Sequence, residues 1–445
     1  MSIVKSTILL AYLLLASGAA FGQNPLTLEQ AKAIALERNL DVVQAMNNVE
    51  SAQSSVLAAT GNYLPTLSAS GGWSHDRSSA RYLNGVEIPS GTSGVTESDY
   101  YRTGVDLNYT IFDGFAREAT HGRATSNAVA AEQRSDRTRQ SVAFQVETQY
   151  LNVLRLEQLV TVSEENLKRD RRQLERITES NKVGALSLAD VYRQQSQVAA
   201  DELNLINAQN DFNKAKADLA SLIGLDMTEE HTFADPAIQP TISKEELDGA
   251  LTQYDSFASV SGRALAARPD FIGARENLSA AESGVTIAKS GYWPSVAASA
   301  GYGLANNKFS RLTDNNDISV GINLRWNIFD GFATNERIQT AAAARRNAEV
   351  SVVQLQRDIN VEVKKALLDL DAARKQYEVS QKGLVSATED RKIAEERYNL
   401  GAGTLLDLLT ANANLVNAQA NGVNASYNFL LSKKRVEYTI GEHAY

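Results

Sequence analysis

The sequence predicts a mainly α-helical protein with a pair of β-hairpins, built from one structural unit that occurs twice. Three observations predict this fold class. Motifs of the first half return in the second half at a fixed spacing, apolar residues recur in heptads over very long segments, and once in each half the period changes to two. Only seven prolines occur in 445 residues, so long helices are expected to dominate.

The duplication is clearest around two Phe-Asp-Gly-Phe turns. Residues 104–116 return as residues 321–333, an offset of 217 (321 against 104). Upstream the offset is 229, because Pro65 corresponds to Pro294. A period of this length is too long for a solenoid repeat and indicates a duplicated domain.

Each repeat is expected to contain a helix, a β-hairpin, a long helix, a tip at a glycine and an antiparallel return helix. The expected divisions are a signal peptide at 1–22, a first repeat at 23–224, a linker at 225–264, a second repeat at 265–441 and a short tail at 442–445. The hairpins are placed at about 66–111 and 295–328, and the tips near 184 and 401. The helices that open the repeats are expected at 26–62 and 265–292, where Pro65 and Pro294 follow them.

The N-terminal residues indicate the cellular compartment of the protein. Lys5 precedes a short apolar run and then small residues up to Gly22, which is typical of a secretory signal peptide cut before Gln23. The chain has no cysteine, so packing or oligomerisation must hold the exported protein together. The formal net charge of −9 argues against a nucleic-acid partner.

The two hairpins have the pattern of membrane strands. Large apolar residues alternate with polar or small ones, namely Val105, Leu107, Tyr109 and Ile111 in the first half and Ile318, Val320, Ile322, Leu324, Trp326 and Ile328 in the second. This alternation places lipid on one face and water on the other. A half-buried soluble sheet is the alternative, but the flanking segments are long helices that offer nothing to cover the apolar face. Four strands cannot close a barrel in lipid, whereas three copies would supply twelve.

The long helices are expected to pack as coiled coils. Residues from Ile359 to Tyr398, and from Val142 to Asn181, follow a 4-3 spacing over more than five heptads. Gly184 and Gly401 end these helices, and antiparallel helices return from them. A non-conducting stalk that spans the periplasm would also explain the heptads, but it would not explain the amphipathic hairpins.

The order of these elements resembles the TolC family of outer-membrane efflux proteins over essentially the whole mature chain. The motifs that carry the resemblance are LTLEQA at 26–31, ARPD at 267–270, YWPS at 292–295, the two Phe-Asp-Gly turns, NKVGALSLAD at 181–190 and YNLGAGTLLD at 398–407. The resemblance implies a homotrimer in the outer membrane of a Gram-negative bacterium. Its twelve-stranded β-barrel would lie in the lipid and continue as an α-helical tunnel through the periplasm.

The resemblance also implies a function. The tunnel would passively conduct substrates, with efflux of multidrug or toxic compounds favoured, and would meet a periplasmic adaptor (membrane fusion) protein and an inner-membrane transporter. An outer-membrane component of type I protein secretion is the alternative within transport. No catalytic grouping, metal-ligand spacing or cofactor motif is visible, so no enzyme activity and no cofactor are expected.

Asp190, Asp407 and Tyr398 are the candidate residues of the periplasmic entrance. Each Asp follows its tip glycine by six residues, and in a trimer each would form a ring of carboxylates that favours cations. Both also stand three residues after Ser187 or Thr404, which predicts capping boxes. The two interpretations stay open. The arginine and the further aspartate that fasten the closed entrance in the family are replaced here by Gly403 and Thr410.

Two further sets of residues complete the predicted sites. The surface that contacts the adaptor is expected at Gly184, Ala185, Gly401, Ala402 and Gly403. The strand-to-helix turns are expected to depend on Asp113, Gly114, Asp330 and Gly331, in a structural role.

Overall fold

The computed structural model describes residues 25–79, 82–83, 86–87, 95–228, 231–254 and 256–442. The predicted signal peptide and the last three residues of the predicted tail lie outside this range. The chain divides into two compact units. We call the first, Met1–Gln44, Asp136–Pro269 and Arg357–Tyr445, the tip unit, and the second, Ala45–Ser135 and Asp270–Gln356, the sheet unit.

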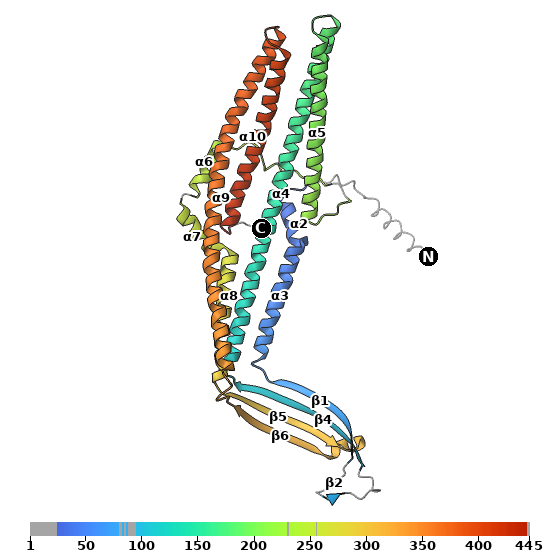
Figure 1. Ribbon diagram of the computed structural model, residues 1–445, viewed down its shortest axis with the longest axis vertical. Helices are drawn as coiled ribbons and strands as arrows, with labels where there is room; N and C mark the ends of the chain where they lie inside the picture. Colours follow the sequence, from blue (N-terminus) through green and yellow to red (C-terminus); the bar gives the residue numbers. More distant parts are fainter. Residues whose placement is uncertain are drawn as a thin grey trace, which may run out of the picture. The chain divides into compact units, whose positions relative to one another are not determined.

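Most described residues are helical (Figure 1). The helices are α2 (Leu28–Arg38), α3 (Leu40–Gly61), α4 (Ala116–Lys182), α5 (Leu188–Leu222), α6 (Lys244–Thr252), α7 (Phe257–Ala267), α8 (Pro269–Lys289), α9 (Ala333–Asn399) and α10 (Leu405–Thr439), with 3-10 turns η1 (Ser290–Tyr292) and η2 (Phe309–Asp314). Helices α4 and α9 have 67 residues each, and α5 and α10 have 35 each. All four obey the offset of 217, as Leu188 and Leu405 illustrate.

The helix that opens each repeat is broken, which corrects the prediction of one helix over 26–62. The chain leaves the helical conformation at Asn39, and at Arg268 in the second repeat. Each breaking residue ties down the end of a return helix, because Asn39 Nδ2 donates to Leu222 O and Arg268 Nη1 donates to Thr439 O, both at 3.2 Å. Helix α7 repeats α2 at the offset of 229, so we propose that the second repeat starts at Phe257 rather than at residue 265.

The four long strands form one antiparallel sheet in the order β1-β4-β5-β6. Their bounds are β1 (Thr66–Ser79), β4 (Val95–Phe112), β5 (Ser295–Asn306) and β6 (Asn316–Arg325), and a separate short pair is β2 (Tyr82–Leu83) with β3 (Val86–Glu87). The expected strand to residue 328 is too long, since β6 ends at Arg325. Its partner there is Ser295, and the preceding Pro294 has no N–H with which to extend the ladder.

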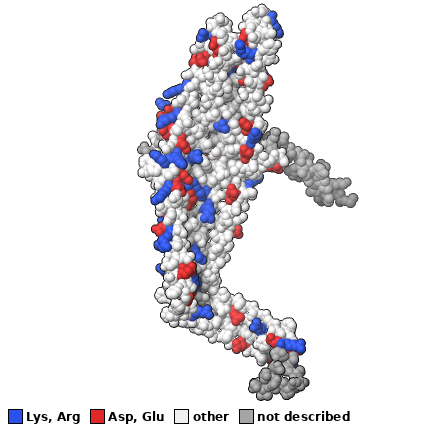
Figure 2. All heavy atoms as spheres, viewed as in Figure 1, with Lys and Arg blue, Asp and Glu red and all other residues white. Residues whose placement is uncertain are grey.

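The core of the tip unit follows the predicted heptads. Val146 and Val153 of α4, and Ile359 and Leu370 of α9, are fully buried. The apolar core also contains Tyr150, whose hydroxyl donates to Leu26 O at 2.8 Å. Coiled-coil packing therefore forms within a single chain. Charges of both signs are interspersed over the helices, with no large field of one sign in the view of Figure 2.

Candidate functional site

One face of the four-stranded sheet carries the large apolar side chains, and they are exposed. Val320 and Ile322 of β6 are 80% and 74% exposed, and Leu67 of β1 is 70% exposed. An apolar surface this continuous marks a contact with lipid or with another molecule. Among the described residues, no helix combines the length and the hydropathy that crossing a membrane requires.

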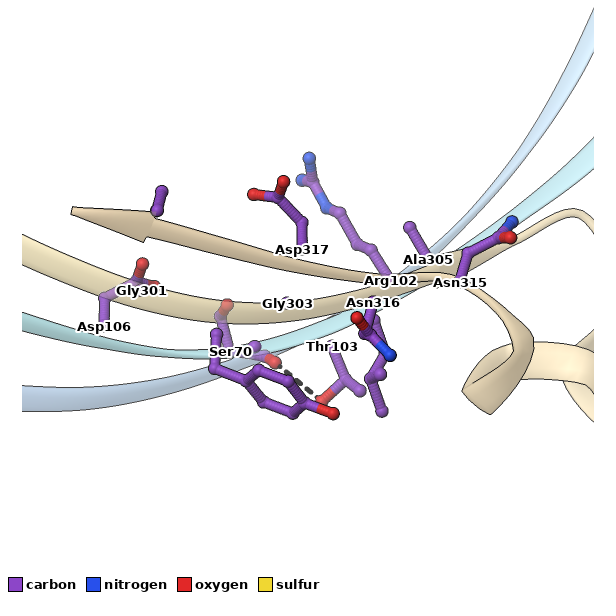
Figure 3. A pocket seen from close by; sticks show the side chains of 14 residues that line it. Ser70, Arg102, Thr103, Asp106, Gly301, Gly303, Ala305, Asn315, Asn316 and Asp317 are labelled. Atoms are coloured by element: carbon purple, nitrogen blue, oxygen red, sulfur yellow. Dashed lines mark hydrogen bonds between the residues drawn. The ribbon is translucent and has the colours of Figure 1, made fainter.

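The opposite face of the sheet is polar and rich in small residues. Strand pairing places Asp106 beside Gly301, and Gly303 beside Asp317. These residues line a concavity of about 320 Å³, and the side chains of Arg102 and Asp317 project from the same side (Figure 3). A Cβ atom added to Gly301 would lie 2.9 Å from the Ser319 hydroxyl oxygen, so larger side chains would crowd this face. The sheet is therefore amphipathic.

Both predicted strand-to-helix turns use the left-handed region of the backbone. Gly114 and Gly331 have φ of +71° and +65°, and the phenylalanines that follow, Phe115 and Phe332, both have φ of +68°. Glycine adopts this conformation without strain, whereas a phenylalanine does so at a cost. Two such residues in succession change the direction of the chain sharply where a strand gives way to a long helix.

The two turns are fastened differently. Asp330 caps the start of α9, because its Oδ2 accepts hydrogen bonds from the Thr334 amide at 2.9 Å and the Thr334 hydroxyl at 2.6 Å. In the first repeat Asp113 occupies the place of Asp330, and Arg117 that of Thr334. Arg117 reaches back to the strand, where its Nη1 donates to Thr110 O at 2.7 Å.

The predicted tips are tight glycine turns. Gly184 and Gly401 have φ of +77° and +72°, and the amides of Ala185 and Ala402 donate to carbonyls five residues earlier, at 2.9 and 2.8 Å. These are the bonds that commonly end a helix at a left-handed glycine. All four residues are exposed, and Gly403 is half-buried.

Asp407 forms the complete capping box that the sequence predicts. The Thr404 amide donates to Asp407 Oδ2 at 3.0 Å, and the Asp407 amide donates to Thr404 Oγ1 at 3.2 Å. The hydrogen bonds from the Thr404 backbone and hydroxyl hold the pKa of Asp407 below its usual range. The side chain is nevertheless exposed, so capping leaves a carboxylate oxygen facing solvent.

Asp190 shows only the hydroxyl half of that arrangement. Its amide donates to Ser187 Oγ at 3.2 Å, and the Ser187 hydroxyl donates to Asp190 Oδ2 at 2.7 Å. The other carboxylate oxygen accepts from Arg193 Nη1 at 3.3 Å, one turn along α5. The charge of Asp190 is thus partly neutralised, whereas the hydrogen bonds that Asp407 accepts within its capping box are uncharged.

Tyr398 lies close to Asp190. Burial, and after it the negative charge of Asp190, raises the pKa of the Tyr398 phenol. The Tyr398 hydroxyl is buried and has no hydrogen-bond partner among the described residues. Asp190 belongs to the first tip and Tyr398 to the second, so the charge at one predicted tip residue acts on a side chain of the other tip.

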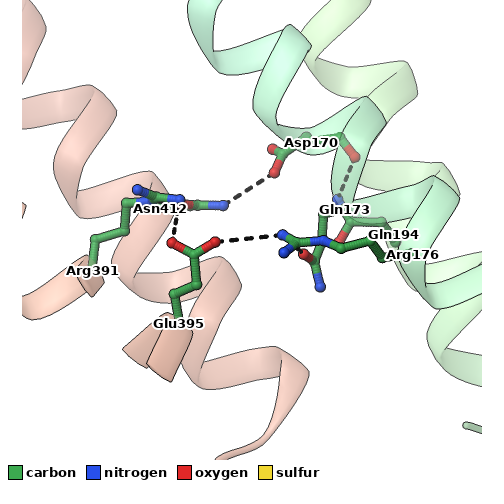
Figure 4. A network of polar contacts seen from close by, with 7 residues as sticks. All are labelled: Asp170, Gln173, Arg176, Gln194, Arg391, Glu395 and Asn412. Atoms are coloured by element: carbon green, nitrogen blue, oxygen red, sulfur yellow. Dashed lines mark hydrogen bonds and ion pairs between the residues drawn. The ribbon is translucent and has the colours of Figure 1, made fainter. Parts of the chain in front are cut away.

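A polar junction that sequence reasoning missed joins the two helical hairpins, α4–α5 and α9–α10 (Figure 4). Asn412 Nδ2 of α10 donates to Asp170 Oδ1 of α4 at 3.1 Å, and Arg176 of α4 pairs with Glu395 of α9 at 3.4 Å. Gln194 of α5 donates to Asp170 O at 3.2 Å. Asp170 and Gln194 are 1% and 0% exposed.

A signal for this junction was present in the sequence. Asp170 occupies a heptad position that the second repeat fills with Ala387, 217 residues later. A charged residue at a core position of a coiled coil specifies a particular partner, at a cost in stability. The same comparison points to Asp201, whose counterpart is Ala418.

Comparison with known proteins places this architecture among outer-membrane channels. The family model described as outer membrane efflux protein matches residues 33–225 and 260–442. The chain is similar to the outer membrane protein TolC of Vibrio cholerae, with 25% identity over 370 residues that cover 80% of each chain. It is also similar to the pyoverdine export outer membrane protein OpmQ of Pseudomonas aeruginosa, with 25% identity over 386 residues, 86% of this chain and 78% of that one.

A solved structure has the same fold. The Campylobacter jejuni CmeC outer membrane channel matches with a TM-score of 0.78 and 20% sequence identity, over 93% of this chain and 85% of that one. At this identity the likeness establishes the arrangement of helices and strands.

Proposed function

The chain belongs to the outer membrane efflux protein family, and from this premise we propose that three copies form a duct that passively conducts small organic compounds out of the cell. Family membership makes the protein an efflux channel of the outer membrane that extends into the periplasm of a Gram-negative bacterium, and not an enzyme.

The open edges of the sheet support assembly. In the order β1-β4-β5-β6, each outer strand pairs along one side only within a single chain. In lipid, the N–H and C=O groups of such an edge would lack hydrogen-bond partners. Pairing β6 of one copy with β1 of the next removes both edges, and three four-stranded sheets give twelve strands, an even number that closed barrels use.

The amphipathic sheet is the observation that carries conduction. Its exposed apolar face suits lipid, and its polar face, with Arg102, Asp106 and Asp317, suits a water-filled interior. A stalk without a lumen has no use for a polar face inside a closed barrel. The same strands lead directly into α4 and α9, the helices expected to continue the duct through the periplasm.

Substrate and partners follow from relatives and from the tips. The relative from Pseudomonas aeruginosa is named for pyoverdine export, and another, from Pseudomonas putida, is the toluene efflux pump outer membrane protein TtgC. Both names favour small organic compounds over polypeptides. The tip residues Gly184, Ala185, Gly401 and Ala402, which are exposed, and the half-buried Gly403 are the proposed contact with a periplasmic adaptor. An inner-membrane transporter would supply the energy.

Ion conduction in a planar lipid bilayer tests the duct. The purified trimer is expected to give discrete currents that prefer cations, because rings of Asp190 and Asp407 line its entrance. Asp407→Asn keeps an oxygen for the Thr404 amide and removes one charge from each chain, so the cation preference should fall several-fold. Thr404→Ala removes the cap and keeps the charge, so it should leave the preference intact. If inserted trimers carry no current under any condition, the duct is contradicted and the interpretation as a non-conducting stalk remains.

Photo-crosslinking in cells tests the partners. A photoreactive residue at Ala185 or Ala402 is expected to capture a periplasmic adaptor that works with a proton-driven drug pump. Capture of an adaptor that belongs to an ATP-driven protein exporter would replace efflux by type I secretion. If the trimers are intact but no protein is captured, the proposal that the tips dock onto an adaptor is contradicted.

A further inference from the structure

Two acidic side chains meet below the tips, in a pocket of about 170 Å³ between α4, α5 and α10. Asp170 and Asp201 are 1% and 4% exposed, and both line this pocket. Two buried carboxylates that face one small pocket repel each other, so one of them retains a proton to a higher pH than an isolated acid does. Burial first, and then Asp170, raises the pKa of Asp201 to about 7.

The surrounding charges do not relieve this repulsion. Arg169 of α4 lowers the pKa of Asp201, but burial and Asp170 outweigh it. Arg391 of α9 is held by Asn412 and Glu395, at 2.9 Å each. Helix α10 presents amides to the pocket, Asn412 and Asn417, and no charge.

Hydrogen bonding leaves a place for a proton on the pair. Asp201 accepts one bond, from Gln197 Nε2 to Oδ1 at 3.1 Å, and its Oδ2 has no partner among the described residues. Asp170 Oδ1 accepts from Asn412 Nδ2. A single proton on the pair gives Asp201 Oδ2 a hydrogen-bonding role and cancels one of the two negative charges.

The pair sits where the two hairpins are joined. Asp170 is the residue that accepts the bond from Asn412, and it therefore links α4 of the first hairpin to α10 of the second. Asp201 belongs to α5, so after loss of the proton a negative charge on α4 repels a negative charge on α5 at this junction. The second repeat folds into helices of the same lengths with Ala387 and Ala418 in these places, so helix formation does not require the acids.

We propose that Asp170 and Asp201 form a proton-binding site that holds α4 and α5 of the first helical hairpin together at this junction while it carries one proton, and that loosens them when the proton leaves. The effect of this site on the entrance of the duct rests on the proposed function, whereas the binding of the proton is independent of that function.

The direction of the pH dependence follows from the raised pKa. The packed state binds the proton more tightly than a separated, hydrated state. In the separated state the pKa of the Asp201 carboxyl returns toward its ordinary value of 3.8. The extra stability is therefore fully present at low pH and is lost as pH rises through about 7. Between these two values, the ratio of separated to packed α4–α5 pairs is expected to rise about tenfold per pH unit.

Spin-label distances in the full trimer test the proposal. Because the chain has no cysteine, Arg171→Cys on α4 and Glu202→Cys on α5 introduce the only labelling sites. The distances are measured at several values from about pH 5 to about pH 8.5, on both sides of the raised pKa. The separated population should grow with pH in the wild type. In Asp201→Asn, a neutral side chain of nearly the same shape, it should stay small at every pH. Asp211→Asn, an exposed acid ten residues further along α5, should behave as the wild type.

Three results would overturn the proposal. The first is a wild-type distance that does not change with pH, and the second is an Asp201→Asn variant that keeps the full dependence. The third is an α4–α5 pair that packs more tightly as pH rises and separates on addition of a chelator. The last result would assign the pair to a divalent cation. If the label distances respond to pH but the trimer carries no bilayer current, the proposed duct is contradicted and the proton site stands. If the trimer carries current but the label distances do not respond to pH, only the proton site is contradicted.

Discussion

Gly114 and Gly331 occupy the same place in the two repeats and have the same left-handed backbone, but their surroundings differ. A Cβ atom added to Gly114 would lie 2.7 Å from Ser290 O and 2.8 Å from Trp293 Cβ. Around Gly331 nothing lies within 4 Å of such an atom. The duplication therefore provides one position with strain alone and one with strain and a backbone clash.

Alanine substitutions at these two positions should differ in cost. Gly331→Ala should destabilise the protein by about 1–2 kcal/mol, the penalty of a left-handed residue with a Cβ atom. Gly114→Ala should cost clearly more, because the backbone at Ser290 must move. The measurement is the temperature at which purified trimers dissociate. Equal losses in the two variants would mean that the turn at Gly114 relaxes freely, and the close contact would then have no energetic weight.

At the scale of elements, periodicity predicted most of the fold. The 4-3 spacing and the two tip glycines gave long helices and their ends to within a few residues, because local patterns determine them. The break at Asn39 was missed, since that residue leaves the helix to reach Leu222 O, a contact remote in sequence. The end of β6 was also missed, because it depends on where the partner strand begins.

The difference between the two faces of the sheet leads to a second prediction, on the cost of a new charge on each face. Ile322→Lys places a charge on the exposed apolar face, and Asn323→Lys places the same charge on the polar face of the same strand. If the apolar face lies in lipid, the first should cost about 2–4 kcal/mol near the middle of the bilayer, and the second little. The yield of trimers in the outer membrane should fall for Ile322→Lys only. Equal yields would place the apolar face against protein or solvent instead.

At the scale of the whole molecule, the sequence could not show how the two repeats meet. Asp190 and Tyr398 were predicted as separate members of an entrance, and the structure brings them close. The contacts of Asp170 with Asn412, and of Arg176 with Glu395, join segments more than 200 residues apart, so no local pattern encodes them. These contacts help to fasten the two hairpins, together with the hydrogen bond from Arg155 Nη1 of α4 to Asn424 Oδ1 of α10 at 2.8 Å.

Opening of the entrance should therefore require the two hairpins to move apart. The Arg176–Glu395 ion pair is partly exposed and contributes only about 0–1 kcal/mol by itself, so breaking it should change little. A covalent link at the same place tests the movement itself. Arg176→Cys with Glu395→Cys, joined by a short reducible crosslinker, should hold the hairpins together and abolish most of the bilayer current, and a reductant should restore it.

The matched control lies within one hairpin. Arg171 of α4 and Glu202 of α5 form an ion pair at 2.7 Å, and both belong to the first hairpin. Arg171→Cys with Glu202→Cys, treated with the same crosslinker and measured at low pH, should leave the current unchanged, because α4 and α5 stay packed there without the crosslink. Full current from the Arg176–Glu395 crosslinked trimer would show that the entrance opens without separating the hairpins. A loss of current in both crosslinked pairs would instead place the movement within each hairpin, between α4 and α5.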